Sequence, residues 1–284
     1  MRAFLLTLSA LTAFAFNSIL CRLALKTELI DASSFTGVRL FSGVAALIAI
    51  SLIVPRKDNE VFRGGNWISA FFLFAYAICF SFAYIGLTTA TGALILFGMV
   101  QTTMITSALV IGERPKSAEW IGLILALGGL VYLILPGLES PTILNSALMA
   151  LAGISWAFYT LRGKRSEDPL KDTTGNFVRT IPFVILFSIP FISRSHFSGK
   201  GILFAVLSGA AASGIGYSVW YGALKYHTAT RAAILQLSVP VIAAAGGIVF
   251  LSENISLRLV FAGILILGGI GLVIMAKNTK KPDQ

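Results

Sequence analysis

The chain has 284 residues, of which 56% are hydrophobic and only 12% are charged, and its mean hydropathy is +0.86. A soluble domain carries about 25% charged residues, and its apolar runs are shorter than those found here. The formal charge of +10 comes mostly from Lys and Arg at the ends of apolar runs, without the clustered basic and aromatic residues of a nucleic-acid surface. Composition and charge therefore exclude an ordinary soluble protein and a nucleic-acid partner.

Ten apolar stretches are long enough to cross a bilayer, since about 20 residues at 1.5 Å each span the hydrocarbon. The run 67–111 exceeds twice that length, so it must fold back, and Gly86-Leu87-Thr88-Thr89 is the expected hairpin. The seventh stretch is short and holds Pro182 and Pro190, which lipid-embedded helices tolerate. The expected spans are 3–25, 33–54, 67–87, 88–111, 118–135, 142–161, 177–192, 202–224, 229–251 and 257–276.

Lys and Arg are distributed unevenly between the two sides of the membrane. Fifteen of the 22 fall in loops and tails on the side of the N-terminus, five fall on the other side, and Arg39 and Arg179 lie within span ends. Positively charged loops stay in the cytoplasm. We therefore expect a multi-pass protein of the cytoplasmic membrane with both termini in the cytoplasm.

The two halves of the chain resemble each other. One offset of 140 positions relates three pairs of charged residues: Arg22 and Arg162, Arg39 and Arg179, and Glu113 and Glu253. Each half holds five helices, and because five is odd the second half begins on the opposite side of the membrane. We therefore predict two inverted five-helix repeats, 1–137 and 141–277, and a cytoplasmic tail, 278–284. Inverted repeats suit alternating access to a site at mid-membrane.

Motifs in both halves resemble a known transporter family. They are Phe16-Asn17-Ser18-Ile19-Leu20-Cys21-Arg22-Leu23-Ala24-Leu25, Phe35-Thr36-Gly37-Val38-Arg39-Leu40, Ile111-Gly112-Glu113-Arg114-Pro115 and Gly128-Gly129, then Tyr221-Gly222-Ala223-Leu224-Lys225, Leu237-Ser238-Val239-Pro240-Val241 and Phe250-Leu251-Ser252-Glu253. The chain is similar to the drug/metabolite transporter superfamily in its ten-helix form with two EamA-type domains. The resemblance implies a central cavity lined by helices one to four and six to nine, with helices five and ten at the periphery.

One position departs from the family pattern. Gln101 stands where the fourth helix usually has a proline, although Pro240 is present in the ninth helix. Family substrates include amino acids and their derivatives, sugars, purines, vitamins and quaternary amines, so the fold does not choose among them. The departure also prevents carrying a substrate over from better-known members.

Polar and aromatic side chains within the spans are the candidate substrate contacts. The alternative is that the polar ones bond neighbouring helices, which averages about 0.6 kcal/mol per contact in lipid. Gln101 and Gln236 are favoured because they occupy related regions of the two halves, and because Pro240 frees the carbonyl of Gln236. Trp156 lies deep enough to face a cavity or to pack as core. The candidate substrate-binding residues are Asn17, Gln101, Thr102, Trp156, Tyr217, Gln236 and Ser238.

Charged and aromatic residues near span ends have gating or anchoring as alternative roles. Arg39 and Arg179 each lie about one turn inside a span, from where a long side chain reaches the interface or contacts substrate. Glu113 and Glu253 are expected to cap helices or to pair with Arg114 or Arg258. The interfacial aromatic belt is the expected place of Tyr84, Tyr159 and Tyr221.

Groups that proton-coupled transport or catalysis would need are absent from the predicted spans. All twelve acidic residues fall in loops or at span ends, so no deep carboxylate relays protons or holds a cation. No nucleophile with a base, metal cluster or cofactor motif is recognisable, and we expect no metal or cofactor.

The leading hypothesis is a secondary transporter that exports a small neutral or zwitterionic metabolite such as an amino acid. The alternatives are a membrane-embedded enzyme and a receptor or scaffold; whether the chain forms a homodimer is left open.

Overall fold

The computed structural model describes residues 2–53, 64–110, 117–135, 141–164, 166–227, 232, 235–236 and 238–278. Within these residues the fold is all-α. Six helices are long and apolar enough to cross a membrane, and four shorter apolar helices accompany them, so the expected all-α class with ten spans is confirmed. Glu113 and parts of the expected ninth span lie outside the described residues.

Five helices make up the first half of the chain. The α3–α4 turn falls where the hairpin was expected, because α3 ends at Ala83 and α4 begins at Thr89. The bounds are α1 Arg2–Lys26, α2 Ala32–Ile53, α3 Trp67–Ala83, α4 Thr89–Val110 and α5 Ser117–Ile134.

The second half repeats this plan. The seventh span starts eight residues before the expected Phe177, because Asp168 caps it by accepting a hydrogen bond from the Lys171 N–H (3.0 Å), and Pro169 occupies its first turn. The bounds are α6 Ile143–Gly163, α7 Pro169–Ser188 with a 3₁₀ turn Ile189–Arg194, α8 Gly199–Val206, the π-helix η3 Leu207–Ile215, α9 Gly216–Leu224, α11 Ser238–Leu251 and α12 Leu257–Asn278.

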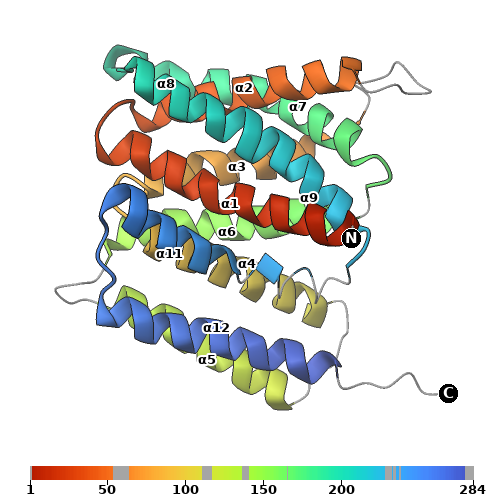
Figure 1. The fold of residues 1–284 in the computed structure, drawn as a ribbon, viewed down its shortest axis with the longest axis vertical. Coiled ribbons are helices and arrows are strands. Elements are labelled where there is room, and N and C mark those ends of the chain that lie inside the picture. Colours follow the sequence, from red (N-terminus) through yellow and green to blue (C-terminus); the bar gives the residue numbers. More distant parts are fainter. Residues whose placement is uncertain are drawn as a thin grey trace.

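The helices form a bundle in which two members stand apart (Figure 1). α5 and α12 pack mainly on each other at one edge, touching the rest through α4. α1 lies inside the bundle and contacts α9, α11 and η3. Large apolar side chains such as Leu52, Ile53, Leu186 and Val249 are exposed, as lipid-facing surface requires. The interior is therefore built around α1.

The eighth span changes its winding halfway. α8, η3 and α9 form one continuous helix over 199–224, and its middle nine residues are π-helical. A π segment offsets the side chains that follow and is frequent at functional sites. Its Gly209 lies so close to α2 that a Cβ there would collide with the backbone carbonyl of Arg39. The absence of a side chain at Gly209 lets the two helices meet.

We expect Gly209→Ala to lower stability by about 1–3 kcal/mol, because the added methyl group overpacks a contact made by backbone. Gly222→Ala in the same span is the matched control, since nothing lies within 4 Å of its Cβ position. The unfolding temperature of each detergent-purified variant measures the effect. Equal unfolding temperatures for wild type and Gly209→Ala would contradict this account of the packing.

Candidate functional site

A buried polar cluster joins helices from both halves of the chain. The Arg39 side chain of α2 donates to the Tyr217 hydroxyl through Nη2 (2.8 Å) and to the Tyr76 hydroxyl (3.3 Å). Asn17, near the middle of α1, donates through Nδ2 to the same two hydroxyls at 3.0 and 3.3 Å. The two tyrosine hydroxyls are 3.2 Å apart. One network thus links α1, α2, α3 and α9.

The π-helical segment supplies the remaining members of the cluster. Arg39 Nε donates to the Ser213 hydroxyl at 3.1 Å, and the Ser208 hydroxyl donates to Asn17 Oδ1. Ser208 and Ser213 are five residues apart, which is about one turn of a π-helix, whereas an α-helix would rotate them apart. The altered winding therefore points both hydroxyls at the same cluster.

Arg39 is a charge buried inside the protein. Its side chain is 1% exposed, and in the described part of the chain no carboxylate pairs with it. The Tyr76 and Phe80 rings lie 5.2 and 5.0 Å from its guanidinium carbon, and such contacts stabilise a buried cation. Among the described residues its Nη1 has no hydrogen-bond partner. Because the side chain is buried and does not reach the surface, the snorkelling alternative for Arg39 is wrong. Burying its charge costs at least about 2.5 kcal/mol.

Aromatic rings surround the polar cluster. The Trp156 ring of α6 lies 4.5 Å from that of Tyr217, 5.0 Å from Tyr76 and 5.3 Å from Phe14. Its indole Nε1 donates to Gln236 Oε1 at 3.4 Å. Trp156 is 2% exposed, so it packs against the cluster and ties it to the ninth span.

The tyrosines expected in an interfacial belt are buried. Tyr84, Tyr159 and Tyr221 are at most 2% exposed. The Tyr221 hydroxyl donates to the backbone carbonyl of Tyr159 at 3.0 Å, which joins α9 to α6. The belt expectation is therefore wrong, because these rings hold helices together within the bundle.

The other predicted residues have different surroundings or contacts. Gln101 is buried in α4. The Thr102 hydroxyl donates to the Gly98 carbonyl of its own helix, and the exposed Ser238 donates to the Leu235 carbonyl. Arg179 donates to the Gly64 and Gly175 carbonyls. Hydrogen bonds and ring contacts thus bring together Asn17, Arg39, Trp156, Tyr217 and Gln236.

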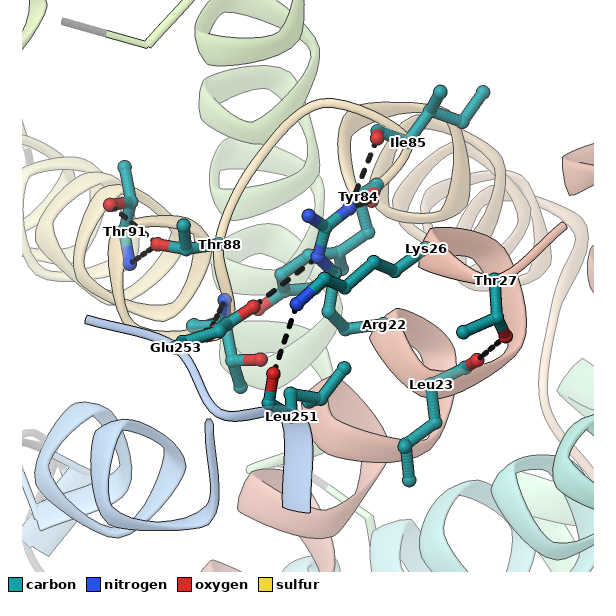
Figure 2. Close-up of polar contacts among 11 residues, drawn as sticks. Arg22, Leu23, Lys26, Thr27, Tyr84, Ile85, Thr88, Thr91, Leu251 and Glu253 are labelled. Atoms are coloured by element: carbon teal, nitrogen blue, oxygen red, sulfur yellow. Dashed lines mark hydrogen bonds and ion pairs between the residues drawn. The ribbon is translucent and has the colours of Figure 1, made fainter. Parts of the chain in front are cut away.

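An ion pair lies near the end of α1 and joins it to the residue that follows α11 by two positions (Figure 2). Arg22 Nε lies 3.3 Å from Glu253 Oε1, and their side chains are only 12% and 7% exposed. Arg22 Nη1 also donates to the Tyr84 carbonyl (2.8 Å), while Glu253 Oε2 accepts from the Thr89 N–H (2.8 Å). Lys26 Nζ donates to the Leu251 carbonyl at 2.9 Å. α1 is therefore tied to α3, α4 and α11.

The partner of Glu253 differs from the expected one. Ser252 ends α11 in a left-handed conformation with φ of 51°, and the Glu253 N–H then donates back to the Gly247 carbonyl. This turn directs the carboxylate toward α1 and not toward Arg258, which instead donates to the Tyr132 carbonyl at 2.9 Å. Of the two alternatives for Glu253, pairing with Arg258 is wrong, whereas its carboxylate does accept from a backbone N–H at the start of a helix, that of Thr89 in α4.

The repeat-related arginine makes a different contact. Arg162, at the end of α6, donates to the Ser69 hydroxyl (2.9 Å) and to Asn66 Oδ1 (3.0 Å) at the start of α3. Arg22 instead contacts the end of α3. Arginines 140 positions apart thus bind α3 at its two opposite ends.

Sequence reasoning missed Tyr76 and Ser208. A signal for Tyr76 was present, because it carries the hydroxyl group nearest the middle of α3 in a run otherwise made mostly of apolar residues. Ser208 gave no such signal, because a π-helical turn is needed to align it with Ser213.

The cluster has the chemistry of a binding site. It combines one permanent positive charge, hydroxyl and amide groups, and aromatic surface, a composition typical of small-molecule sites. Among the described residues of the cluster, no nucleophile is paired with a base.

Comparisons with known proteins agree with this architecture. The model of the EamA-like transporter family matches residues 1–135 and 144–275. An uncharacterised protein of Pseudomonas aeruginosa is 47% identical, covering 96% of this chain and 94% of its own length. A Salmonella typhimurium protein named "probable amino-acid metabolite efflux pump" is 26% identical, covering 76% and 77%. A crystal structure that is 21% identical superposes with a TM-score of 0.68 over 97% of this chain and 99% of its own, which supports the fold.

The Arg22 and Glu253 pair is expected to be stronger than a surface ion pair. Because both side chains are largely buried, a double-mutant cycle of Arg22→Gln and Glu253→Gln should give a coupling of about 1–3 kcal/mol, against 0.2–1 kcal/mol for exposed pairs. Unfolding of the detergent-purified variants by denaturant measures it. A cycle of Arg22 with the exposed Glu28 is the control, and a coupling for Arg22 and Glu253 no larger than this control would refute the buried pair.

Proposed function

The chain belongs to the EamA-like transporter family, and from that premise we propose that it is a secondary transporter exporting a small neutral or zwitterionic metabolite, such as an amino acid. The observation that carries the proposal is the buried cluster of Asn17, Arg39, Tyr76 and Tyr217. Polar groups are expensive inside a membrane protein and mark substrate pathways. The cluster lies where helices of the two halves meet, as a transporter site does.

Alternating access is the proposed mechanism. The two family regions, 1–135 and 144–275, support two repeats that move against each other around the cluster. The Arg22 and Glu253 pair closes one end by tying α1 to α11. Opening that end requires the pair to separate, so the pair is proposed as a gate contact. Substrate binding would supply the free energy by favouring one arrangement over the other.

The substrate class and the direction are supported by relatives. The Salmonella relative, and an Escherichia coli protein 23% identical over 80% of this chain, carry the name "probable amino-acid metabolite efflux pump". A zwitterion suits the cluster because the cluster offers both hydrogen-bond donors and hydrogen-bond acceptors. The excess of Lys and Arg on the side of the N-terminus supports a cytoplasmic-membrane protein with both termini in the cytoplasm, and efflux would then move the metabolite out of the cell.

The test is counterflow in proteoliposomes that contain the purified protein and a pool of labelled amino acids. We expect saturable uptake of at least one compound, which an excess of that compound abolishes. Trp156→Ala should lower its uptake about tenfold, since losing 1.4 kcal/mol of binding corresponds to a factor of ten.

Trp120→Ala is the matched control, because Trp120 is 49% exposed on the peripheral α5. It should transport like wild type. Absence of uptake for every amino acid, with and without proton and sodium gradients, would count against this substrate class. Equal uptake by wild type and Trp156→Ala would count against the proposed place of the site.

A further inference from the structure

We propose that Arg39 binds the carboxylate group of the transported molecule, which restricts the substrate to compounds that carry one. This inference rests on the proposed function and adds the chemical group that the site recognises. The observation behind it is the mismatch between donors and acceptors around Arg39.

The guanidinium has more N–H groups than acceptors. Nε donates to Ser213, and Nη2 donates to Tyr76 and Tyr217. Nη1 carries two N–H groups, and in the part of the chain that the structure describes it has no partner. A buried donor without an acceptor costs stability. The cluster therefore has hydrogen-bonding capacity that only an acceptor group can satisfy.

The tyrosine pair adds a further donor. Tyr76 and Tyr217 have two hydroxyl hydrogens, and one of them is used in the bond between them. Either hydroxyl can donate across this 3.2 Å contact, and in both cases the hydrogen of the other hydroxyl has no acceptor among the described residues. A hydroxyl hydrogen and the Nη1 group therefore belong to one cluster and lack acceptors together. An oxygen acceptor with two atoms, such as a carboxylate, satisfies both.

Charge favours the same ligand. Arg39 stays protonated in proteins, and no carboxylate of the described residues pairs with it. A carboxylate bears one negative charge and neutralises the site, whereas a phosphate with nearly two charges would leave a net negative charge in a buried place. A purely cationic compound would be repelled. Arginine also binds carboxylates through paired, charge-assisted hydrogen bonds.

Arg179, the repeat-related counterpart of Arg39, already has acceptors for its guanidinium group. Arg179, 140 positions later, donates to the carbonyls of Gly64 at 2.7 Å and Gly175 at 2.9 Å, near the start of α3. Backbone carbonyls already serve as its acceptors, whereas Arg39 points into the aromatic interior beside Tyr76 and Phe80. The proposed anchor is thus specific to the first half.

The experiment is a thermal-shift titration of the detergent-purified, full-length protein. The probes are the neutral L-amino acids, and for each one that stabilises the protein, its carboxamide and its decarboxylated amine with the same side chain. We expect the amino acid to raise the unfolding temperature and the two analogues to bind at least about tenfold more weakly, because neither carries the carboxylate. Inorganic phosphate should give no shift.

Variants test the residue itself. Arg39→Gln is expected to lose the difference between amino acid and carboxamide, and Arg39→Lys to keep part of it because the charge remains. Arg258→Gln is the matched control at the peripheral α12, where Arg258 donates to the Tyr132 carbonyl, and it should retain the wild-type difference. If Arg39→Gln does not fold, the analogue series on wild type still decides the question.

Each outcome bears on one claim. Equal stabilisation by the amino acid and its carboxamide, stabilisation by no carboxylate, or unchanged discrimination in folded Arg39→Gln would overturn the carboxylate anchor. Counterflow of amino acids with no carboxylate preference would leave the transporter proposal standing and remove this inference. Carboxylate binding that needs Arg39, without any flux, would support the carboxylate anchor and count against the transporter proposal.

Discussion

The cost of burying the Arg39 charge is the constraint on which the interior depends. A guanidinium placed about 10 Å along a membrane helix, at 1.5 Å per residue, must be solvated by protein groups because lipid offers none. Here Tyr76, Tyr217 and Ser213 solvate it through hydrogen bonds, and aromatic rings contact its face. These partners come from two other spans, α3 and the eighth span, so satisfying one charge fixes how helices of both halves meet.

Several irregular features follow from that requirement. The π-helical turn of the eighth span aligns Ser208 and Ser213 with the cluster, and Gly209 allows this span to lie against the backbone of α2. α5 and α12 take no part in the cluster and pair at the edge of the bundle (Figure 1). In the described part of the chain, the contacts of the cluster and the Arg22 and Glu253 pair therefore belong to the other spans and their connections.

The sequence was sufficient for the spans and for some members of the buried cluster. Apolar length predicted the ten spans and the α3–α4 turn, and polar residues in apolar runs pointed to Asn17, Trp156 and Tyr217. It could not predict which side chains meet. The lipid-facing and interior faces of these helices are both apolar, so periodicity does not reveal which face is buried. Without knowing the buried face, neither the burial of Arg39 nor the contacts of Tyr76 could be predicted. The start of α7 was missed although Asp168 and Pro169 signalled it, and the partner of Glu253 depended on the left-handed turn at Ser252.

The most direct test of the central claim, that Arg39 is the ligand-binding charge of the interior, is a crystal structure of the protein grown with bromoacetate. Bromine is located by its anomalous scattering, independently of the protein density. The account predicts bromine density beside the Arg39 guanidinium, with the carboxylate accepting from Nη1. Bromoacetate bound only elsewhere, with Nη1 bonded to a protein oxygen, would contradict it.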